Sequence, residues 1–389
     1  MERRLRAREA RPVLREARAR EGRLQRPAAL SAASPAALVT AAPAALRAEF
    51  LGSGGEYFRI WIVNVALTIA TLGFYSPWAK VRRAQYFHRN LRVAGAGFDF
   101  DANPWAILRG RALAIPLLVG VQLASRTSAA VSAVAGLLFV ALLPWLVTAS
   151  LRFRLYHTLH RGLRFSFHGS VAEAFRAFLA WPLAAALSLG LLLPTAIQRR
   201  QRFVYAGSAF GGTRFESAVA LGAIYRLCFG TSWIALGSAA VAGWATSSWL
   251  SAAGHRIGEV APDAAGAALV APILGGGALF VAGLVVAGAY LQVRLHNLVW
   301  NDLRLGPHRF RSHQTLGACL ALQLGNLLGV VATLGLFLPF AEVRSARWRA
   351  ACTEVVPGAS LDEIAAGTAQ AQGAAADELA EIFGFDVGF

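Results

Sequence analysis

Long apolar runs constrain this chain more than any other feature of its sequence. They occupy residues 57–78, 112–123, 129–148, 175–197, 227–250, 267–292 and 316–340. A helix needs about 20 apolar residues to cross a hydrocarbon core, and most of the runs reach that length. Hydrophobic residues make up 56% of the chain and charged residues 15%, whereas soluble domains have about 45–50% and about 25%. The runs therefore predict an all-α polytopic membrane protein with about seven apolar helical segments.

The apolar runs belong to internal repeats. One fixed displacement pairs Phe50 with Phe167, Leu72-Gly73 with Leu189-Gly190, and Pro77 with Pro194. A larger displacement pairs Asn64 with Asn326 and Thr71-Leu-Gly with Thr333-Leu-Gly. Such an ordered set of matches is typical of a repeat architecture. We therefore expect repeat units at about 50–164 and 167–304, followed by a third related element at 310–349.

Two membrane topologies are compatible with these repeats. If runs 57–78, 175–197 and 316–340 each cross once, the chain has seven spans, and the two units form inverted repeats as in many transporters. If these runs instead turn back at Thr-Leu-Gly or Ser-Leu-Gly, the chain has four spans and three re-entrant elements. The positive-inside rule favours the second arrangement, whereas the length of the runs favours the first. We expect seven spans by a narrow margin.

The ends of the chain differ in composition from its middle. Residues 1–49 are rich in Arg and Ala, and prolines interrupt their apolar part, which predicts a disordered basic arm rather than a signal peptide. Residues 354–389 contain acidic residues but no Lys or Arg, and predict a peripheral acidic tail. The membrane domain is therefore expected at residues 50–353.

Four stretches of the chain resemble the YjgN-like family of bacterial inner-membrane proteins, a domain of unknown function. They are Phe50-x-Gly-x-Gly-Gly-Glu-Tyr-Phe with Asn64 and Thr71-Leu-Gly-x-Tyr-x-Pro-Trp-Ala-x-Val-Arg; Arg161-Gly-Leu-Arg-Phe-x-Phe-x-Gly; Arg294-Leu-His-Asn-Leu-Val-Trp-Asn with Arg309-Phe-Arg-Ser; and Thr333-Leu-Gly-Leu-x-x-Pro. The likeness covers about residues 50–353, and it departs mildly at Phe340, where the family pattern has Trp. The resemblance implies a multi-pass location in the bacterial inner membrane and no known activity.

Polar residues inside the apolar runs are the first candidate site. Asn64 and Asn326 each lie seven residues before the Thr of a Thr-Leu-Gly motif, at Thr71 and Thr333. A buried amide in lipid needs a partner, so these asparagines either join helices or form a polar ligand site where helices are broken. The motif itself is also explained by helix termination, with Gly capping one helix and Ser76-Pro77 starting the next.

Arginines beside the apolar runs are the second candidate site. Arg82, Arg83, Arg199, Arg200 and Arg344 follow the motifs and alternate with aromatic residues. In a soluble protein this alternation could indicate RNA binding, but beside apolar spans it favours contact with anionic lipid headgroups. We expect the lipid bilayer as the partner and no nucleic acid.

The sequence offers little support for catalysis. It contains no P-loop, GxSxG or HExxH motif and no acidic pair inside an apolar run, so we expect no catalytic residue, cofactor or metal, and no enzyme. Our leading hypothesis is a membrane protein that transports or binds a small or lipidic anionic molecule. The alternative is a non-transporting scaffold that docks anionic lipids or protein partners.

Overall fold

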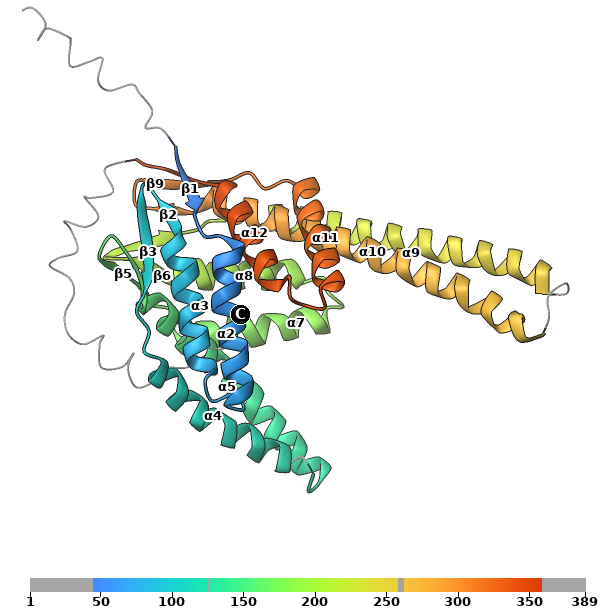
Figure 1. Ribbon diagram of the computed structural model, residues 1–389, viewed down its shortest axis with the longest axis horizontal. Helices are drawn as coiled ribbons and strands as arrows, with labels where there is room; N and C mark the ends of the chain where they lie inside the picture. Colours follow the sequence, from blue (N-terminus) through green and yellow to red (C-terminus); the bar gives the residue numbers. More distant parts are fainter. Residues whose placement is uncertain (1–44, 125, 258–261, 359–389) are drawn as a thin grey trace, which may run out of the picture. The chain divides into compact units, whose positions relative to one another are not determined.

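The computed structural model describes residues 45–358 except residue 125 and residues 258–261. Within these residues, ten short antiparallel strands close into a barrel in the order β1-β10-β9-β8-β7-β6-β5-β4-β3-β2 (Figure 1). The strands are β1 (Leu46–Phe50), β2 (Leu91–Val93), β3 (Ala96–Phe100), β4 (Thr158–His160), β5 (Leu163–Phe167), β6 (Ser208–Phe210), β7 (Thr213–Glu216), β8 (Arg304–Leu305), β9 (His308–Ser312) and β10 (Thr353–Val356).

The barrel corrects the all-α prediction, although helices still make up most of the described chain. The sequence does not predict the strands, because none is longer than 5 residues. Alternation of apolar and polar residues over so few positions is hard to recognise beside the long apolar runs. Arg164 and Phe165, which lie in one of the stretches that carry the family resemblance, are neighbours on β5. Part of the alternation of Arg with aromatic residues in this linker therefore reflects a strand, in which successive side chains point to opposite faces.

Two-residue turns close one rim of the barrel. Val93 pairs with Ala96, and the intervening Ala94 and Gly95 have φ angles of 53° and 75°, as a type I′ turn requires. Two-residue turns also join β4 to β5, β6 to β7 and β8 to β9, and the first residue of each has a positive φ angle. Because the strands are joined in pairs at this rim, the described helices all connect to the opposite rim, which we call the helical rim.

Short helical hairpins fill three of the connections at the helical rim of the described chain. The first is α2 (Gly54–Ala70) with α3 (Ser76–Asn90); the second is α6 (Val171–Phe175), the π-helix η3 (Arg176–Ala180) and α7 (Trp181–Leu187) with α8 (Leu193–Ala206); the third is α11 (Leu316–Ala332) with α12 (Leu338–Ala351). We call them hairpins one, two and three. The predicted start of a helix at Ser76-Pro77 is confirmed. Each run that we expected to cross as one helix is thus interrupted.

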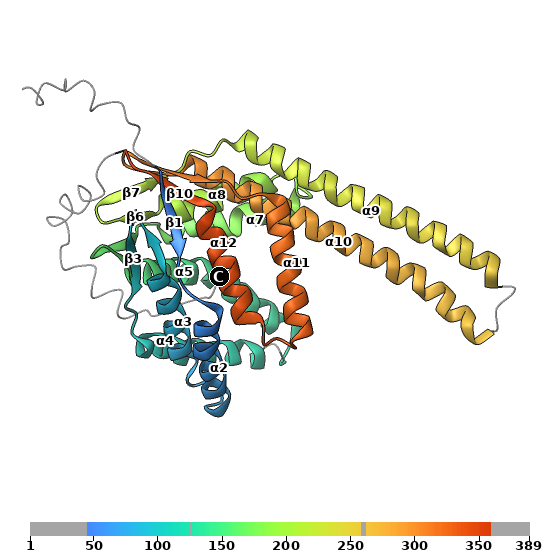
Figure 2. The ribbon, with the colours of Figure 1, turned by 45° about the horizontal axis from the view of Figure 1, so that its top comes forward.

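Long helical hairpins fill the other two connections within the described residues. They are α4 (Pro104–Ala124) with α5 (Ala129–Tyr156), and α9 (Leu221–Ile257) with α10 (Pro262–Asp302). In Figures 1 and 2, α9 and α10 run side by side away from the strands. Glycines allow this close approach, because a Cβ at Gly276 would collide with Thr246 and one at Gly283 with Ser238. In the described part of the chain, three helices are long and apolar enough to cross a membrane: Ala129–Tyr156, Leu221–Ala253 and Val270–Asp302.

Neighbouring hairpins pack in sequence order beneath the barrel. The returning helix of each contacts the first helix of the next, in the pairs α3–α4, α5–α6, α8–α9 and α10–α11, and α12 returns to α2. The last contact is well packed: Tyr57 of α2 and Val343 of α12 are buried in one apolar cluster with Phe50 of β1. The first and last parts of the described chain thus close the ring of helices as well as the barrel.

The ends of the membrane domain differ slightly from the predicted boundaries. Leu46 to Glu49 fall in the predicted basic arm, yet they belong to β1, which pairs with both β2 and β10. Glu354 falls in the predicted acidic tail, yet it lies on β10 and its carboxylate accepts from Arg47 Nε at 3.1 Å. The rest of the predicted arm, and the tail beyond Gly358, lie outside the described residues. Strand pairing across the barrel decides both boundaries.

Candidate functional site

The turn of hairpin one is closed by the Thr71 side chain. Its hydroxyl donates to the Leu67 carbonyl at 2.7 Å and accepts from the Tyr75 N–H at 3.0 Å. The N–H groups of Leu72, Gly73, Phe74 and Ser76 bond to carbonyls within the same turn. The backbone of the turn therefore reverses direction without needing a donor or acceptor from outside.

The same pattern recurs in the other two short hairpins. Thr333 Oγ1 donates to the Gly329 carbonyl and accepts from the Phe337 N–H. Ser188 Oγ donates to the Ala185 carbonyl and accepts from the Leu192 N–H. The backbone N–H groups around Leu189 and Leu334 follow the arrangement of hairpin one. The hydroxyls of Thr71 and Thr333 are thus fully used inside their own turns.

Each turn presents a leucine in an unfavourable conformation. Leu72, Leu189 and Leu334 have φ angles of 49°, 53° and 50°, in the left-handed region. A non-glycine residue there costs roughly 1–2 kcal/mol. The three side chains are nevertheless 97%, 95% and 96% exposed on the protein surface. Each tip therefore presents an exposed apolar side chain at a backbone position that Gly or Asn would occupy at lower cost.

The structure does not join the two candidate asparagines. Asn64 is buried on α2, and Asn326 on α11 donates to Ser345 Oγ of α12 at 3.1 Å. The Oδ1 atoms of both side chains are buried, and among the described residues neither has a hydrogen-bond partner. Asn64 therefore belongs to hairpin one and Asn326 to hairpin three, and no hydrogen bond connects the two side chains.

The candidate arginines on α3 and α12 occupy equivalent places. Arg82 lies over the Tyr75 ring at 5.8 Å, and Arg344 lies over the Phe337 ring at 5.9 Å. In both cases the arginine follows the aromatic residue by seven positions, so the guanidinium points back along the helix towards the tip. The arrangement holds a cation near an apolar tip by a cation–π contact.

Hairpin two holds its arginines differently. Arg199 lies over the Trp181 ring of α7 at 5.6 Å, and Arg200 lies over the Phe178 ring of η3, also at 5.6 Å. An apolar groove of about 670 Å³ lies between these helices, lined mostly by Ala and Leu, with Arg200 as its charged residue. The candidate arginines, with Arg344 on hairpin three, thus lie on three separate hairpins rather than in one common site.

Arg83 differs from its neighbour Arg82. Its Nε donates to the Glu342 carboxylate of α12 at 3.1 Å, so its charge is compensated across hairpins one and three. Arg347 of α12 donates to the Gly52 carbonyl at 2.8 Å, just before α2. These contacts hold α12 against hairpin one and leave Arg83 less suited to bind an outside anion.

A second groove, of about 520 Å³, lies between α2 and α3. Three arginines line it: Arg59 from α2, and Arg82 and Arg89 from α3. Ile60 and Val63 supply an apolar wall. Sequence reasoning missed the roles of Arg59 and Arg89; their spacing along each helix was visible, but their convergence depends on how α2 packs against α3.

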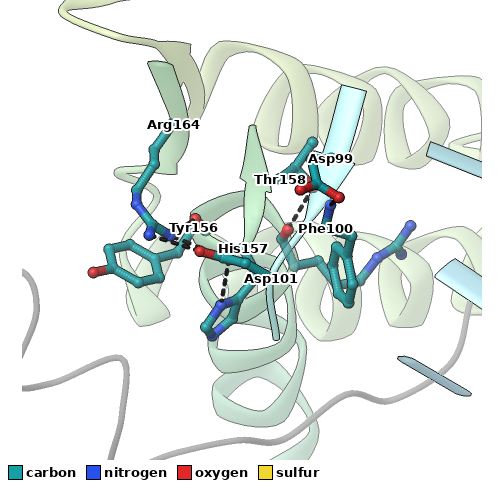
Figure 3. A network of polar contacts seen from close by, with 8 residues as sticks. Asp99, Phe100, Asp101, Tyr156, His157, Thr158 and Arg164 are labelled. Carbon is teal, nitrogen blue, oxygen red and sulfur yellow. Dashed lines mark hydrogen bonds and ion pairs between the residues drawn. The ribbon is translucent and has the colours of Figure 1, made fainter. Parts of the chain in front are cut away.

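A polar cluster fixes the helical rim next to this groove (Figure 3). Asp101 accepts from Arg164 through both carboxylate oxygens, at 3.2 and 2.7 Å, and its Oδ1 lies 3.1 Å from His157 Nδ1. Asp99 accepts from Arg89 Nε at 2.8 Å, and this arginine lowers the pKa of the Asp99 carboxyl. The cluster links β3, β5 and the end of α5, and it holds one side of Arg89.

No group of three or more His, Cys, Asp or Glu that could hold a metal ion occurs among the described residues. The described site supplies positive charge, apolar surface and two grooves. Together with the long apolar helices, these features define an integral membrane protein with basic hairpins.

Comparisons with known proteins agree with this class. The chain belongs to the family described as "Bacterial protein of unknown function (DUF898)", whose model matches residues 45–382. It is 26% identical over 355 residues to the inner membrane protein YjgN of Salmonella typhimurium LT2, covering 79% of this chain and 87% of that protein. It is 30% identical to YjgN of Escherichia coli K12 over 142 residues, which is 36% of each chain. No solved structure matches the chain.

The family and the apolar helices confirm the predicted resemblance and place this protein in the bacterial inner membrane as a multi-pass protein. The candidate polar and arginine sites stay predictions.

Proposed function

We propose that this protein binds an anionic lipid in the inner membrane through its short hairpins. The arginines of the returning helices α3, α8 and α12 carry the proposal. Among them, Arg82 and Arg344 sit at equivalent positions near apolar, exposed tips. Near an anionic membrane surface, each such cation contributes about 1 kcal/mol. A hairpin with an apolar tip and a basic returning helix suits the boundary between acyl chains and phosphates.

We further propose that the short hairpins enter the bilayer and return to the same side, so the chain has four spans and three re-entrant hairpins. Helix α2 has 17 residues and rises only about 25 Å, less than a hydrocarbon core of about 30 Å. In the hydrocarbon core the polar groups of the backbone must be satisfied within the protein. The internally bonded turns at Thr71, Ser188 and Thr333 meet that condition.

A contact with α4 gives the depth of the first tip. Arg111 of α4 donates to the hydroxyl of Ser76, which itself donates to the Gly73 carbonyl. From Arg111 to its end at Ala124, α4 rises about 20 Å further. If α4 reaches the far surface of a core about 30 Å thick, the first tip lies about 10 Å below the near surface. This depth fits a re-entrant hairpin rather than a span.

The arginines orient the barrel towards the cytoplasm. With all hairpins leaving one rim, the linkers that carry nearly all Lys and Arg lie on one side, whereas Arg126 and Arg256 are the basic residues near the loops of the long hairpins. The positive-inside rule assigns the arginine-rich side to the cytoplasm. The seven-span alternative would distribute the arginines almost evenly.

Two exposed positions test the topology. In a background without Cys228, Cys319 and Cys352, Arg92→Cys and Thr127→Cys are labelled in intact cells with a membrane-impermeant maleimide. We expect Thr127→Cys to react from outside and Arg92→Cys only after lysis, whereas seven spans predict the reverse.

Lipid preference tests the function. The full chain in detergent is titrated with dioleoylphosphatidylglycerol and, separately, with dioleoylphosphatidylcholine, and bound lipid is counted by native mass spectrometry. Tighter retention of the anionic lipid supports the proposal, and equal retention of both lipids contradicts it.

Transport is the second candidate function. The buried, unpartnered Oδ1 atoms of Asn64 and Asn326 favour it, because such atoms can bind a polar solute. Neither groove between the hairpin helices includes an asparagine from this pair, so binding without transport is the better-supported function. Uptake of a labelled anion into proteoliposomes that is lost in Asn64→Leu would favour transport instead.

A further inference from the structure

We propose that the groove between α2 and α3 binds the phosphate of an anionic phospholipid, with Arg59 and Arg82 as its principal ligands. This inference rests on the proposed function and names the site and the chemical group within it. Arg59 and Arg82 come from the two antiparallel helices of hairpin one and line the same groove. Two guanidinium groups that reach one groove from opposite walls can each offer two N–H donors to phosphate oxygens.

The charges of the groove are not compensated to the same degree. Arg83, on the adjacent position of α3, is paired with Glu342 and points to α12. Arg89 is paired with Asp99 at the helical rim. Arg82 instead lies over the Tyr75 ring, a contact that leaves its N–H donors free for another acceptor. An incoming phosphate therefore adds charge compensation at Arg59 and Arg82 beyond the contacts that the described residues supply.

The walls of the groove fit an amphiphile rather than a free anion. Ile60 and Val63 lie on α2 within the groove, and Val63 is 48% exposed. These residues lie further along α2 than Arg59, towards the exposed tip at Leu72. A phosphate held near Arg59 therefore directs an attached acyl chain along Val63 towards the hydrocarbon side of the hairpin.

Hairpins two and three differ at the equivalent positions. Hairpin two has Arg176 and Arg199 where hairpin one has Arg59 and Arg82, but its groove lies elsewhere and contains neither arginine. Hairpin three has Ala321 in place of Arg59. Of the two grooves described above, the one in hairpin one thus contains this pair of arginines and the one in hairpin two does not.

The test compares the binding of defined lipids by full-length variants. The wild type, Arg59→Gln, Arg82→Gln and the double variant are incubated in detergent with dioleoylphosphatidylglycerol or dioleoylphosphatidylcholine, and Kd values are obtained by native mass spectrometry. Loss of one arginine contact of about 1 kcal/mol weakens binding about fivefold. We expect the Kd for phosphatidylglycerol to rise about fivefold in each single variant and more than about tenfold in the double variant. The change for phosphatidylcholine should be smaller, because its choline cation offsets the charge of its phosphate. Arg309→Gln, an exposed arginine on β9, is the matched control and should bind as the wild type does.

Three outcomes separate the possibilities. If the wild type prefers the anionic lipid but the double variant binds it equally well, the groove is not the site, although the proposed function survives. If the wild type shows no preference, both proposals fail. Inorganic phosphate at about 100-fold excess over the lipid should compete only weakly for the groove. Full competition would identify a free anion as the ligand and overturn the assignment to a lipid.

Thermal unfolding of each variant shows whether it is folded, so that weaker lipid binding is not mistaken for misfolding. Arg59 and Arg82 are both exposed, and exposed substitutions usually change stability by about 0.5 kcal/mol or less. Arg82→Lys gives a second control, because it keeps the charge but removes the planar pair of donors. Binding that is restored only partly by Lys supports phosphate recognition by the guanidinium group.

Discussion

The turn of hairpin one offers a direct measure of where the tip lies. Replacing Thr71 with Val keeps the shape of the side chain but removes a donor to the Leu67 carbonyl and the acceptor for the Tyr75 N–H. If the tip is in water, solvent replaces the lost acceptor, and the cost stays near the net value of a hydrogen bond, about 0.5–1.5 kcal/mol. If the tip lies in hydrocarbon, the unpaired N–H costs about 1–3 kcal/mol or more.

The difference in unfolding free energy between a tip in water and a tip in hydrocarbon becomes larger when all three turns are substituted together. The turns at Thr71, Ser188 and Thr333 are on separate hairpins, so their effects should add. The triple variant T71V/S188A/T333V is then expected to lose about 3–9 kcal/mol in lipid. The variant T71S, which keeps the hydroxyl, is the control and should retain most of the stability of the wild type.

The assay is unfolding of the full chain reconstituted in nanodiscs, followed by tryptophan fluorescence as sodium dodecyl sulfate is added. A T71V variant within about 0.5 kcal/mol of the wild type would show that the hydroxyl is not needed at the tip. That result would refute the conclusion that the turn satisfies its own backbone in the bilayer.

Two further predictions concern other parts of the fold. Gly276→Leu should separate α9 from α10, because even a Cβ there collides with Thr246, and we expect a loss of about 1–3 kcal/mol in the same unfolding assay; Gly277→Ala, where a Cβ meets nothing, should change little. His160 is stacked on Phe98 at 4.3 Å, and burial, with Arg161 nearby, lowers its pKa below 6.5. Folding therefore favours the neutral ring, so stability is retained above pH 6.5 and falls as the pH drops below it. The variant His160→Phe should flatten this decline in the melting temperature, and an unchanged pH profile would contradict the reasoning.

Composition and repeats predicted part of the fold. The apolar runs predicted a membrane protein, and the recurrence of Leu-Gly and Pro marked the three places where a run could break. Local chemistry suffices for these features, because Ser-Pro starts α3 at its first turn and because the bonds that close each turn lie within a few residues. From the sequence alone, each of the three runs could form either one membrane-spanning helix or two short helices.

The candidate sites were predicted less well than the turns. Arg82 and Arg83 are neighbours in sequence and were equal candidates, yet Arg83 is paired with Glu342 of α12 and Arg82 is not. That distinction depends on a contact between residues far apart in the chain. The groove needs Arg59 as well, and no spacing rule brings a residue of α2 opposite one of α3 until the turn between them is known.

The sequence by itself determined that the chain is a membrane protein and that three of its apolar runs carry a possible break at Thr71, Ser188 and Thr333, because hydrophobicity and turn-forming residues are local properties. Only the tertiary structure decided that the linkers form a barrel. Strands such as β8, with 2 residues, have too little local preference to be recognised, and they exist because neighbours on both sides supply their hydrogen bonds. Pairing between β1 and β10 then closes the barrel and joins the two ends of the described fold. This pairing depends on all the other strands of the ring, which bring the two ends together.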